Sequence, residues 1–243
     1  MSDSPSSTRN PRHSLRGAFI TFEGIDGCGK TTQARLLADK LKAHDYPVVE
    51  TREPGGTAIG KRLRDVLLDP GITGMTPNCE LLLYLADRTQ HLAEVIRPAL
   101  ARGDTVICDR FHDATVAYQH HGRGLDLGPV SSLISAEFDP TPPDTTFWLD
   151  LDVKAARGRI AARAEVQSAQ EGAERGNASP EPPEYPVTRM ECEDDNFHLR
   201  VSIGYEQLHK SYPQRIVRID GAGGVEAIHV AIWENLTRRF HVL

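Results

Sequence analysis

The segment at residues 24–31 reads Gly-Ile-Asp-Gly-Cys-Gly-Lys-Thr and stands between an apolar run typical of a strand and a run typical of a helix. In this pattern, glycines allow successive backbone N–H groups to wrap a phosphate chain without obstruction from a Cβ atom. Lys30 would reach the β- and γ-phosphates of a nucleotide, and the Thr31 hydroxyl would hold Mg²⁺. The segment predicts a phosphate-binding P-loop, with a glycine-rich turn and an exposed lysine as the alternative. The residues expected to contact the nucleotide are Gly24, Ile25, Asp26, Gly27, Cys28, Gly29, Lys30 and Thr31.

The rest of the chain alternates short apolar runs with longer amphipathic runs, which is the pattern of βαβ units around a parallel sheet. Strands are expected at 18–23, 48–52, 105–109, 145–150 and 215–220. Helices are expected at 30–43, 59–68, 77–101, 113–118, 130–138, 153–163, 196–211 and 225–239. These elements predict an α/β fold of the P-loop NTPase type, a five-stranded parallel sheet with helices on both faces and a lid.

Two segments interrupt this pattern. Residues 1–17 are rich in Ser, Pro, Asn and Arg, so we expect a disordered extension ahead of a single P-loop domain at 18–243. Residues 164–187 are loaded with Glu, Gly, Ser and Pro, and this composition favours a mobile loop over a helix or strand. We interpret this second segment as a lid insertion.

Composition excludes several classes of protein. A net charge of −6 argues against a broadly basic surface that holds nucleic acid, so small-molecule partners are favoured. The four cysteines are far apart and lack both zinc spacing and a disulfide framework. We find no apolar run long enough for a membrane span and no apolar leader. We therefore expect a cytoplasmic protein without nucleic-acid or membrane partners.

Three further motifs carry candidate chemistry. The run 106–110 is an apolar strand ending in Asp109 and Arg110, which at the carboxyl end of a parallel strand could serve Mg²⁺ and a phosphate. A surface salt bridge is the alternative.

The turn 52–56 (Arg-Glu-Pro-Gly-Gly) follows another strand and precedes Arg64 on the next helix. Tyr84 and Arg88 are four residues apart on a predicted helix, so a ring and a guanidinium could hold a flat base together, or could be a solvated pair.

Taken together, the motifs resemble those of the thymidylate kinase family, whose members phosphorylate dTMP to dTDP with ATP. The likeness is carried in family order by FEGIDGCGKTTQ, TREPGG, LYLADR, DRFHDATVAYQ and RMECEDDNFHLRVSIGY, and covers about residues 18–240. The resemblance implies ATP as phosphate donor, Mg²⁺ as cofactor, dTMP as acceptor and a homodimer.

The resemblance also assigns roles to individual residues. It implies that Asp26 positions Mg²⁺ and the acceptor phosphate, that Asp109 serves the metal, and that Arg64 and Arg110 grip the dTMP phosphate, since two guanidiniums offset the repulsion between anionic substrates. The residues implied to surround the nucleoside are Glu53 near the sugar, Tyr84 stacked on thymine, Arg88 on its carbonyl edge, Thr115 and Gln119 around the base, and Tyr118 at the 2′ position.

Family members differ in where an extra arginine reaches the transferred phosphate, either from the P-loop or from the lid. Because the P-loop position is Gly27, the resemblance implies the bacterial type, with the arginine in the lid. Arg163 and Arg189 are the candidates, with Arg159 and Arg175 behind them. The catalytic set is thus Lys30, Asp26, Arg110, Arg163 and Arg189.

Rival functions remain open from the sequence. Another P-loop kinase could act on a nucleoside or a different monophosphate, and a nucleoside kinase could recruit Glu23 or Asp109 as its base. A nucleotide-dependent switch would leave the acceptor-side residues without a purpose, and a catalytically silent relative would not need Lys30, Thr31, Asp109 and Arg110 intact.

Overall fold

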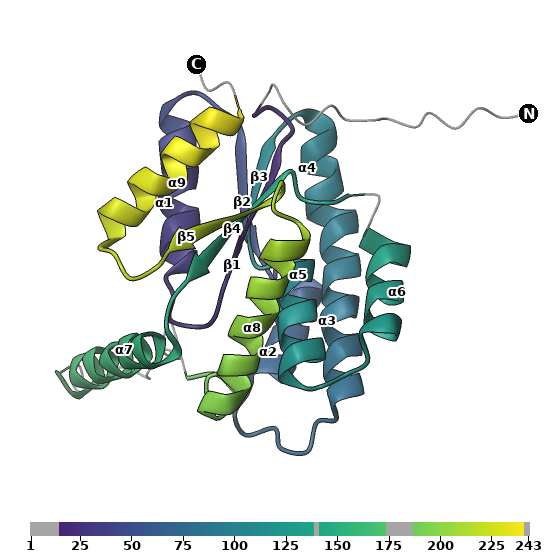
Figure 1. Ribbon diagram of the computed structural model, residues 1–243, viewed down its shortest axis with the longest axis vertical. Coiled ribbons are helices and arrows are strands. Elements are labelled where there is room, and N and C mark those ends of the chain that lie inside the picture. The colour runs from purple at the N-terminus through teal and green to yellow at the C-terminus, as the bar shows by residue number, and fades with distance from the viewer. Residues whose placement is uncertain (1–14, 139–140, 174–186, 241–243) are drawn as a thin grey trace, which may run out of the picture.

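The computed structural model describes residues 15–138, 141–173 and 187–240. Its centre is a single five-stranded parallel sheet with strand order β2-β3-β1-β4-β5 (Figure 1). The strands are β1 (Phe19–Glu23), β2 (Val48–Arg52), β3 (Thr105–Asp109), β4 (Thr145–Asp150) and β5 (Ile216–Asp220). The predicted fold class is confirmed, and each expected strand lies within one residue of its observed bounds.

Helices cover both faces of the sheet, with α1 and α9 on one side and α3, α4, α6 and α8 on the other (Figure 1). The helices are α1 (Lys30–Ala43), α2 (Ala58–Leu68), α3 (Pro77–His91), α4 (Arg97–Arg102), α5 (His112–Thr115), α6 (Leu127–Phe138), α7 (Val153–Ala173), α8 (Asp195–Ser211) and α9 (Val225–Arg239). Two π-helical turns, η1 (Leu92–Ile96) and η2 (Val116–Gly122), follow α3 and α5.

The alternation of side chains along β3 divides the core between these two layers. Val106 and Cys108 pack in a cluster with residues of α3, η1 and α4, whereas Ile107 packs in the larger cluster that includes α1 and α9. All three side chains are fully buried. A strand buried on both faces is typical of the central strands of a parallel sheet, and this burial fixes β3 and its carboxyl end rigidly.

The carboxyl ends of three strands meet at one edge of the sheet. In the register of the sheet, Asp109 of β3 stands opposite Phe22 of β1 on one side and opposite Arg52 of β2 on the other. Because the P-loop leaves β1 at the same edge, residues far apart in sequence converge there, as is usual for ligand sites in open α/β sheets.

Two predicted helices contain π-helical turns in the structure. The helix expected at 77–101 is interrupted by the wide turn η1, and Pro98, which lacks the N–H of a regular helix, follows directly in α4. The helix expected at 113–118 is short, and its second half belongs to η2, which carries Tyr118 and Gln119. Such wide turns inside helices are frequent at functional sites.

The expected boundaries of the two irregular segments also need correction. Leu15 is buried at 1% exposure, and its carbonyl oxygen accepts a hydrogen bond from Thr105 Oγ1 at 2.6 Å, so ordered chain begins before residue 18. The loop predicted at 164–187 is wrong in its first part, because α7 continues to Ala173. Residues 1–14 and 174–186, and with them Arg175, lie outside the described residues.

Across the described ranges, no helix combines the length and the apolar character needed to cross a membrane.

Candidate active site

The P-loop requires glycine at two positions where it packs against the rest of the fold. Gly24 has φ 138°, and a Cβ there would lie 2.5 Å from Leu149 O. Gly27 has φ 83°, and a Cβ there would lie 2.4 Å from the backbone oxygen of Ala156 in α7. Both contacts are with backbone atoms, which cannot rotate away. With α7 in this position, the loop cannot carry an arginine at position 27.

Lys30 begins α1 and folds back over its own loop. Its Nζ donates to Ile25 O at 2.8 Å and lies 4.0 Å from Asp26 Oδ1, and the side chain is only 6% exposed. These contacts hold the ammonium group at the centre of the loop. A phosphate chain wrapped by the loop would therefore meet a lysine whose position is already fixed.

Thr31 and Asp109 form a polar pair where the P-loop meets the end of β3. Thr31 Oγ1 donates to Asp109 Oδ2 at 2.5 Å, and Asp109 Oδ1 is a buried oxygen without a hydrogen-bond partner. Mg²⁺ takes oxygen ligands and is usually bound through one or two carboxylates together with water and substrate phosphates. The described residues hold no group of three His, Cys, Asp or Glu side chains that would form a cage made of protein alone. The pair fits a magnesium ion shared with a nucleotide.

Arg110, directly after β3, has a left-handed backbone with φ 72°, which is uncommon and costly for a residue with a side chain. Its guanidinium donates to Asp26 Oδ1 at 2.6 Å and to the Tyr118 hydroxyl at 2.9 Å. Burial alone would raise the pKa of Asp26, but Arg110 and Lys30 outweigh it and hold that pKa well below its ordinary value. The strained backbone thus aims a cation at an ionised carboxylate of the P-loop.

Positive charge is concentrated next to this pair. Arg64 of α2 donates through Nη1 to Pro54 O at 2.9 Å. Burial, followed by repulsion from Arg52, lowers the pKa of the Arg64 guanidinium, and Arg110 adds to this repulsion. Like charges held together without an equal number of carboxylates favour binding of an anion. Arg52 lines the same space, although we did not assign it to the site from the sequence.

Arg88 is a buried residue of α3 and is 2% exposed. Its Nε donates to Glu53 Oε2 at 2.6 Å, its Nη1 to Thr115 Oγ1 at 2.7 Å and its Nη2 to Phe111 O at 2.9 Å. Charge-assisted bonds of this kind fix the plane of a guanidinium. The guanidinium of Arg88 is therefore held in one orientation at the cavity that it lines.

Gln119 is placed by a second buried carboxylate. Its Nε2 donates to Glu80 Oε1 at 2.9 Å, and Glu80 also binds Arg123. Arg189 joins this carboxylate from the far side of the lid, with Nη2 2.7 Å from Glu80 Oε2 and Nε donating to Leu67 O at 3.0 Å. Arg189 is thus held by Glu80 and Leu67, outside the residues that line the cavity.

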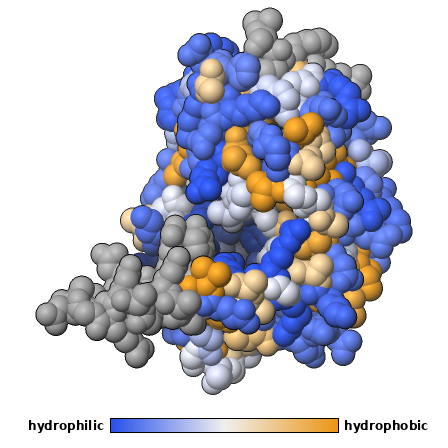
Figure 2. Space-filling view, turned by 90° about the vertical axis from the view of Figure 1, so that its left-hand side faces the viewer, coloured by the Kyte–Doolittle hydropathy of each residue, from blue (hydrophilic) through white to orange (hydrophobic). Residues whose placement is uncertain are grey.

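One cavity of about 1290 Å³ joins these features. Figure 2 shows a recess with hydrophilic walls at the centre of the face it views. The predicted site residues that line the cavity are Asp26, Gly27, Cys28, Gly29, Lys30, Thr31, Glu53, Arg64, Tyr84, Arg88, Asp109, Arg110, Thr115, Tyr118, Gln119 and Arg163. Gly24, Ile25 and Arg189 are predicted site residues outside that lining.

Two arginines of α7 reach the cavity from the lid side. Arg163 donates through Nη2 to Glu191 Oε1 at 2.7 Å, and Arg159 donates through Nη2 to Gly221 O at 2.9 Å. They lie one turn apart on the helix whose backbone excludes a side chain at Gly27. Two guanidiniums from α7 therefore line the cavity, whereas the P-loop has no room for an arginine at Gly27.

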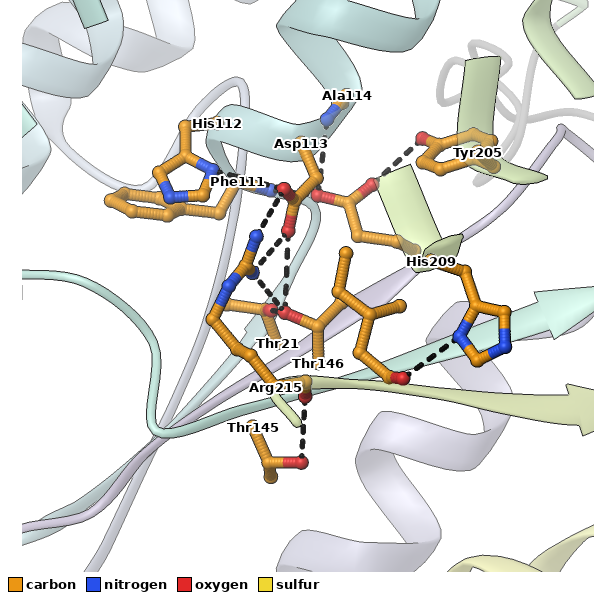
Figure 3. A network of polar contacts seen from close by, with 12 residues as sticks. Thr21, Phe111, His112, Asp113, Ala114, Thr145, Thr146, Tyr205, His209 and Arg215 are labelled. Atoms are coloured by element: carbon orange, nitrogen blue, oxygen red, sulfur yellow. Dashed lines mark hydrogen bonds and ion pairs between the residues drawn. The ribbon is translucent and has the colours of Figure 1, made fainter. Parts of the chain in front are cut away.

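A buried network beneath the site was not predicted as such. Glu23 Oε1 accepts from the backbone N–H of Phe111 at 2.7 Å, and its Oε2 accepts from the Tyr205 hydroxyl at 2.7 Å. Figure 3 shows Asp113 facing Arg215, which donates to it through Nη1 and Nη2 at 2.6 and 2.7 Å.

Burial and the neighbouring Asp113 raise the pKa of Glu23 to about 7. Glu23 at the end of β1 was a visible signal in the sequence, but nothing near Tyr205 in the sequence marks that tyrosine as the partner of Glu23.

Comparison with known proteins adds independent findings. A family model described as thymidylate kinase matches residues 22–232. The chain is 45% identical over 227 residues to the thymidylate kinase of Geobacter sp. (strain M21), covering 93% of this chain and 94% of that protein. It is 49% identical over 209 residues to the thymidylate kinase of Gloeobacter violaceus, covering 86% and 89%. A crystal structure of thymidylate kinase from Ehrlichia chaffeensis superposes with a TM-score of 0.69 at 32% identity, covering 91% of this chain and 99% of that one.

Proposed function

The chain belongs to the thymidylate kinase family and so transfers the γ-phosphate of ATP to dTMP, giving dTDP and ADP, and we propose that the cavity described above is where this transfer occurs. The observation that carries the assignment is that one cavity joins the P-loop to a separate group of arginines, Arg64, Arg88 and Arg110. The donor nucleotide occupies the P-loop end, and the acceptor occupies the end lined by Arg88 and Arg110.

At the donor end, the backbone N–H groups of residues 24–31 and the Lys30 ammonium bind the phosphates of ATP. Thr31 and Asp109, with Asp26 nearby, would hold Mg²⁺, which when bound neutralises phosphate charge. The unpartnered oxygen of Asp109 supports this assignment. Catalysis of phosphoryl transfer rests mainly on positioning and charge neutralisation, so no residue here needs to form a covalent intermediate.

At the acceptor end, Arg64 and Arg110 hold the phosphate of dTMP, and Asp26 keeps Arg110 in place through the 2.6 Å bond. A phosphate monoester is largely ionised at neutral pH, so its oxygen can attack the γ-phosphate without a strong base. A nucleoside hydroxyl would need such a base. Glu23 and Asp109, the candidates for that role, are instead bound to Phe111 and Tyr205 and to Thr31 respectively, which favours the monophosphate as acceptor.

The base of dTMP lies against Arg88, whose guanidinium faces the cavity with Thr115, while Tyr84 packs on the ring and Gln119 lines its edge. Tyr118 bonds both Arg110 and Asp26, and we place it beside the sugar together with Glu53. The fixed orientation of Arg88 supports recognition of a carbonyl acceptor on the base.

Arg163 is our candidate for the lid arginine that reaches the transferred phosphate, with Arg159 next to it on α7. Both line the cavity, and the packing of Gly27 against Ala156 leaves no room for an arginine in the loop. Arg189 fits a different role, since its bonds to Glu80 and Leu67 anchor the chain where it returns from the lid.

A homodimer and a cytoplasmic location complete the proposal. Ile59, Val66 and Leu82 are apolar side chains exposed by 53%, 40% and 59% on the contacting helices α2 and α3, and burial against a second copy would remove them from water. Light scattering should then give twice the chain mass, and Ile59→Glu should reduce it. The four cysteines are free thiols, as is usual in a reducing compartment.

A pair of variants tests the division into two ends. Lys30→Ala should lower kcat about 100-fold or more while leaving the calorimetric Kd for dTMP nearly unchanged, because the lysine contacts the donor. Arg110→Ala should raise the Kd for dTMP about tenfold or more, because it loses charged hydrogen bonds to the acceptor. Unchanged dTMP binding in Arg110→Ala, or unchanged turnover in Lys30→Ala, would overturn the assignment.

A further inference from the structure

His91 is a fully buried residue at the end of α3, three residues after Arg88. It is outside the lining of the substrate cavity. Its Nδ1 lies 2.9 Å from Glu53 Oε1, and its Nε2 lies 2.7 Å from Thr51 Oγ1. Both ring nitrogens therefore have partners: Thr51 is in β2, and Glu53 directly follows that strand and begins the turn at 53–56.

Glu53 connects this histidine to Arg88. One carboxylate oxygen, Oε1, is bound to His91, and the other, Oε2, accepts from Arg88 Nε at 2.6 Å. The Glu53 side chain is 2% exposed, as is that of Arg88. The orientation of the carboxylate is thus fixed from both sides, and this carboxylate is the charged one of the three acceptors that hold the Arg88 guanidinium.

The protonation of these groups follows from their chemistry. Burial opposes ionisation of Glu53, but Arg88 and then His91 outweigh burial and keep its pKa below the ordinary value. An ionised carboxylate only accepts hydrogen bonds, so His91 Nδ1 carries a proton and donates it. In the neutral ring Nε2 then accepts from the Thr51 hydroxyl. The bond to Glu53 is the one that bears on Arg88.

Asp87 and His91 of α3 also contact the backbone of the turn at 53–56. A Cβ on Gly56 would lie 2.4 Å from His91 Nε2, so the backbone of the turn rests directly on the imidazole. Gly55 N donates to Asp87 Oδ1 at 3.0 Å, and Pro54 O accepts from Arg64 at 2.9 Å. A displacement of the turn would therefore reach the phosphate-binding arginine as well as Arg88.

We propose that His91 is a positioning residue for dTMP: through Glu53 it fixes the orientation of Arg88, and through the turn at 53–56 it steadies Arg64. It contacts no substrate, and its effect is confined to the acceptor end of the cavity. The inference rests on the proposed role of Arg88 in binding the base. The hydrogen bonds of His91 are with Glu53 and Thr51, and neither of these residues belongs to the P-loop, so KM for ATP should not change.

Three substitutions at one position separate positioning from packing. His91→Asn places an amide N–H near the position of Nδ1 and can keep the bond to Glu53. His91→Gln reaches the position of Nε2 and keeps the contact with Thr51 instead. His91→Ala removes both. Steady-state kinetics with the full chain would give KM for dTMP, KM for ATP and kcat for each variant, alongside its thermal unfolding midpoint.

We expect His91→Ala and His91→Gln to raise KM for dTMP about tenfold, the lower end of the effect of losing a hydrogen bond to a charged group. His91→Asn should stay within about threefold of the parent, and KM for ATP should be unchanged in all three. Rescue by glutamine but not asparagine, an unchanged KM for dTMP in all variants, or equal changes in both KM values would overturn the proposal, whatever the unfolding midpoints.

Arg88→Ala in the same series separates this inference from the proposed site. If Arg88→Ala raises KM for dTMP and His91→Gln does not, the site stands and the role of His91 is refuted. If Arg88→Ala leaves KM for dTMP unchanged, the proposed base site itself is refuted.

Discussion

Thr31 and Asp109 are 78 residues apart in the chain, yet the threonine hydroxyl donates to the Asp109 carboxylate at 2.5 Å where the P-loop meets the end of β3. The contact depends on β1 and β3 being neighbours in the sheet, with Phe22 and Asp109 in register. It leaves the other Asp109 oxygen buried without a partner. A buried oxygen in that state calls for an ion or a water beside it, and the charge of the carboxylate favours a cation.

The first prediction concerns this metal. Asp109→Asn keeps the size of the side chain but removes its charge, so we expect the Mg²⁺ concentration for half-maximal activity to rise about tenfold or more. Titration of activity with MgCl₂ after removal of metal by EDTA measures it. Asp39→Asn, at an exposed position of α1, is the control. An unchanged Mg²⁺ requirement in Asp109→Asn would contradict the assignment.

The second prediction concerns the packing of the P-loop against α7. Gly27→Ala puts a Cβ 2.4 Å from Ala156 O at a residue with φ 83°, so the loop or the helix must shift and KM for ATP should rise about tenfold or more, through misplacement of the phosphate-binding groups. Gly158→Ala is the matched control, because a Cβ at that α7 position meets nothing within 4 Å. Equal KM values for ATP in the two variants would refute this reading of the loop.

The third prediction identifies the lid arginine. Arg163→Ala should lower kcat about 100-fold with little change in KM for dTMP, as expected when charge stabilisation in the transition state is lost. Arg157→Ala is the control, because it removes an exposed arginine of the same helix that pairs with Asp195 and does not line the cavity. If Arg189→Ala lowered kcat more than Arg163→Ala, the roles given to these two residues would be reversed.

The fourth prediction concerns pH and stability. The pKa of Glu23 rises from its ordinary value of 4.5 to about 7 on folding. Between those pH values the native protein binds more protons at this site than the unfolded chain does, so this residue makes the native state less stable as pH rises. Glutamine does not titrate, and its amide can keep the contacts with Phe111 and Tyr205.

Glu23→Gln should therefore gain stability relative to the parent as pH rises from about 4.5 to 7, by about 2 kcal/mol or more. Urea unfolding of both proteins at several pH values across this range measures the difference. A difference in unfolding free energy that stays constant with pH would show that Glu23 does not titrate in this way.

Much of the fold and the donor site could be predicted because their signals are local. The P-loop pattern and the buried strand ending in Asp109 and Arg110 each occupy a few consecutive residues. The link from His91 through Glu53 to Arg88 could not be predicted, since a helix with Arg88 and His91 reads equally well as solvated. That link depends on one buried carboxylate, Glu53, which is 35 residues from Arg88 and 38 residues from His91 in the sequence.

The length of α7 was misjudged for a different reason. Composition averaged over 164–187 mixed two unlike halves, and the Pro-rich second half dominated the interpretation. The first half reads AEVQSAQEGA, most of which consists of good helix formers. Its helical propensity extends α7 well beyond Arg163, to Ala173.

The central claim is that this chain phosphorylates dTMP, and an acceptor panel tests it most directly. Purified protein with ATP and Mg²⁺ would be offered dTMP, dUMP, thymidine, dCMP and AMP at matched concentrations, and ADP release would be followed for each. The account predicts the highest kcat/KM with dTMP and almost no activity with thymidine, because Arg64 and Arg110 need an acceptor phosphate. A higher kcat/KM for thymidine than for dTMP would contradict it.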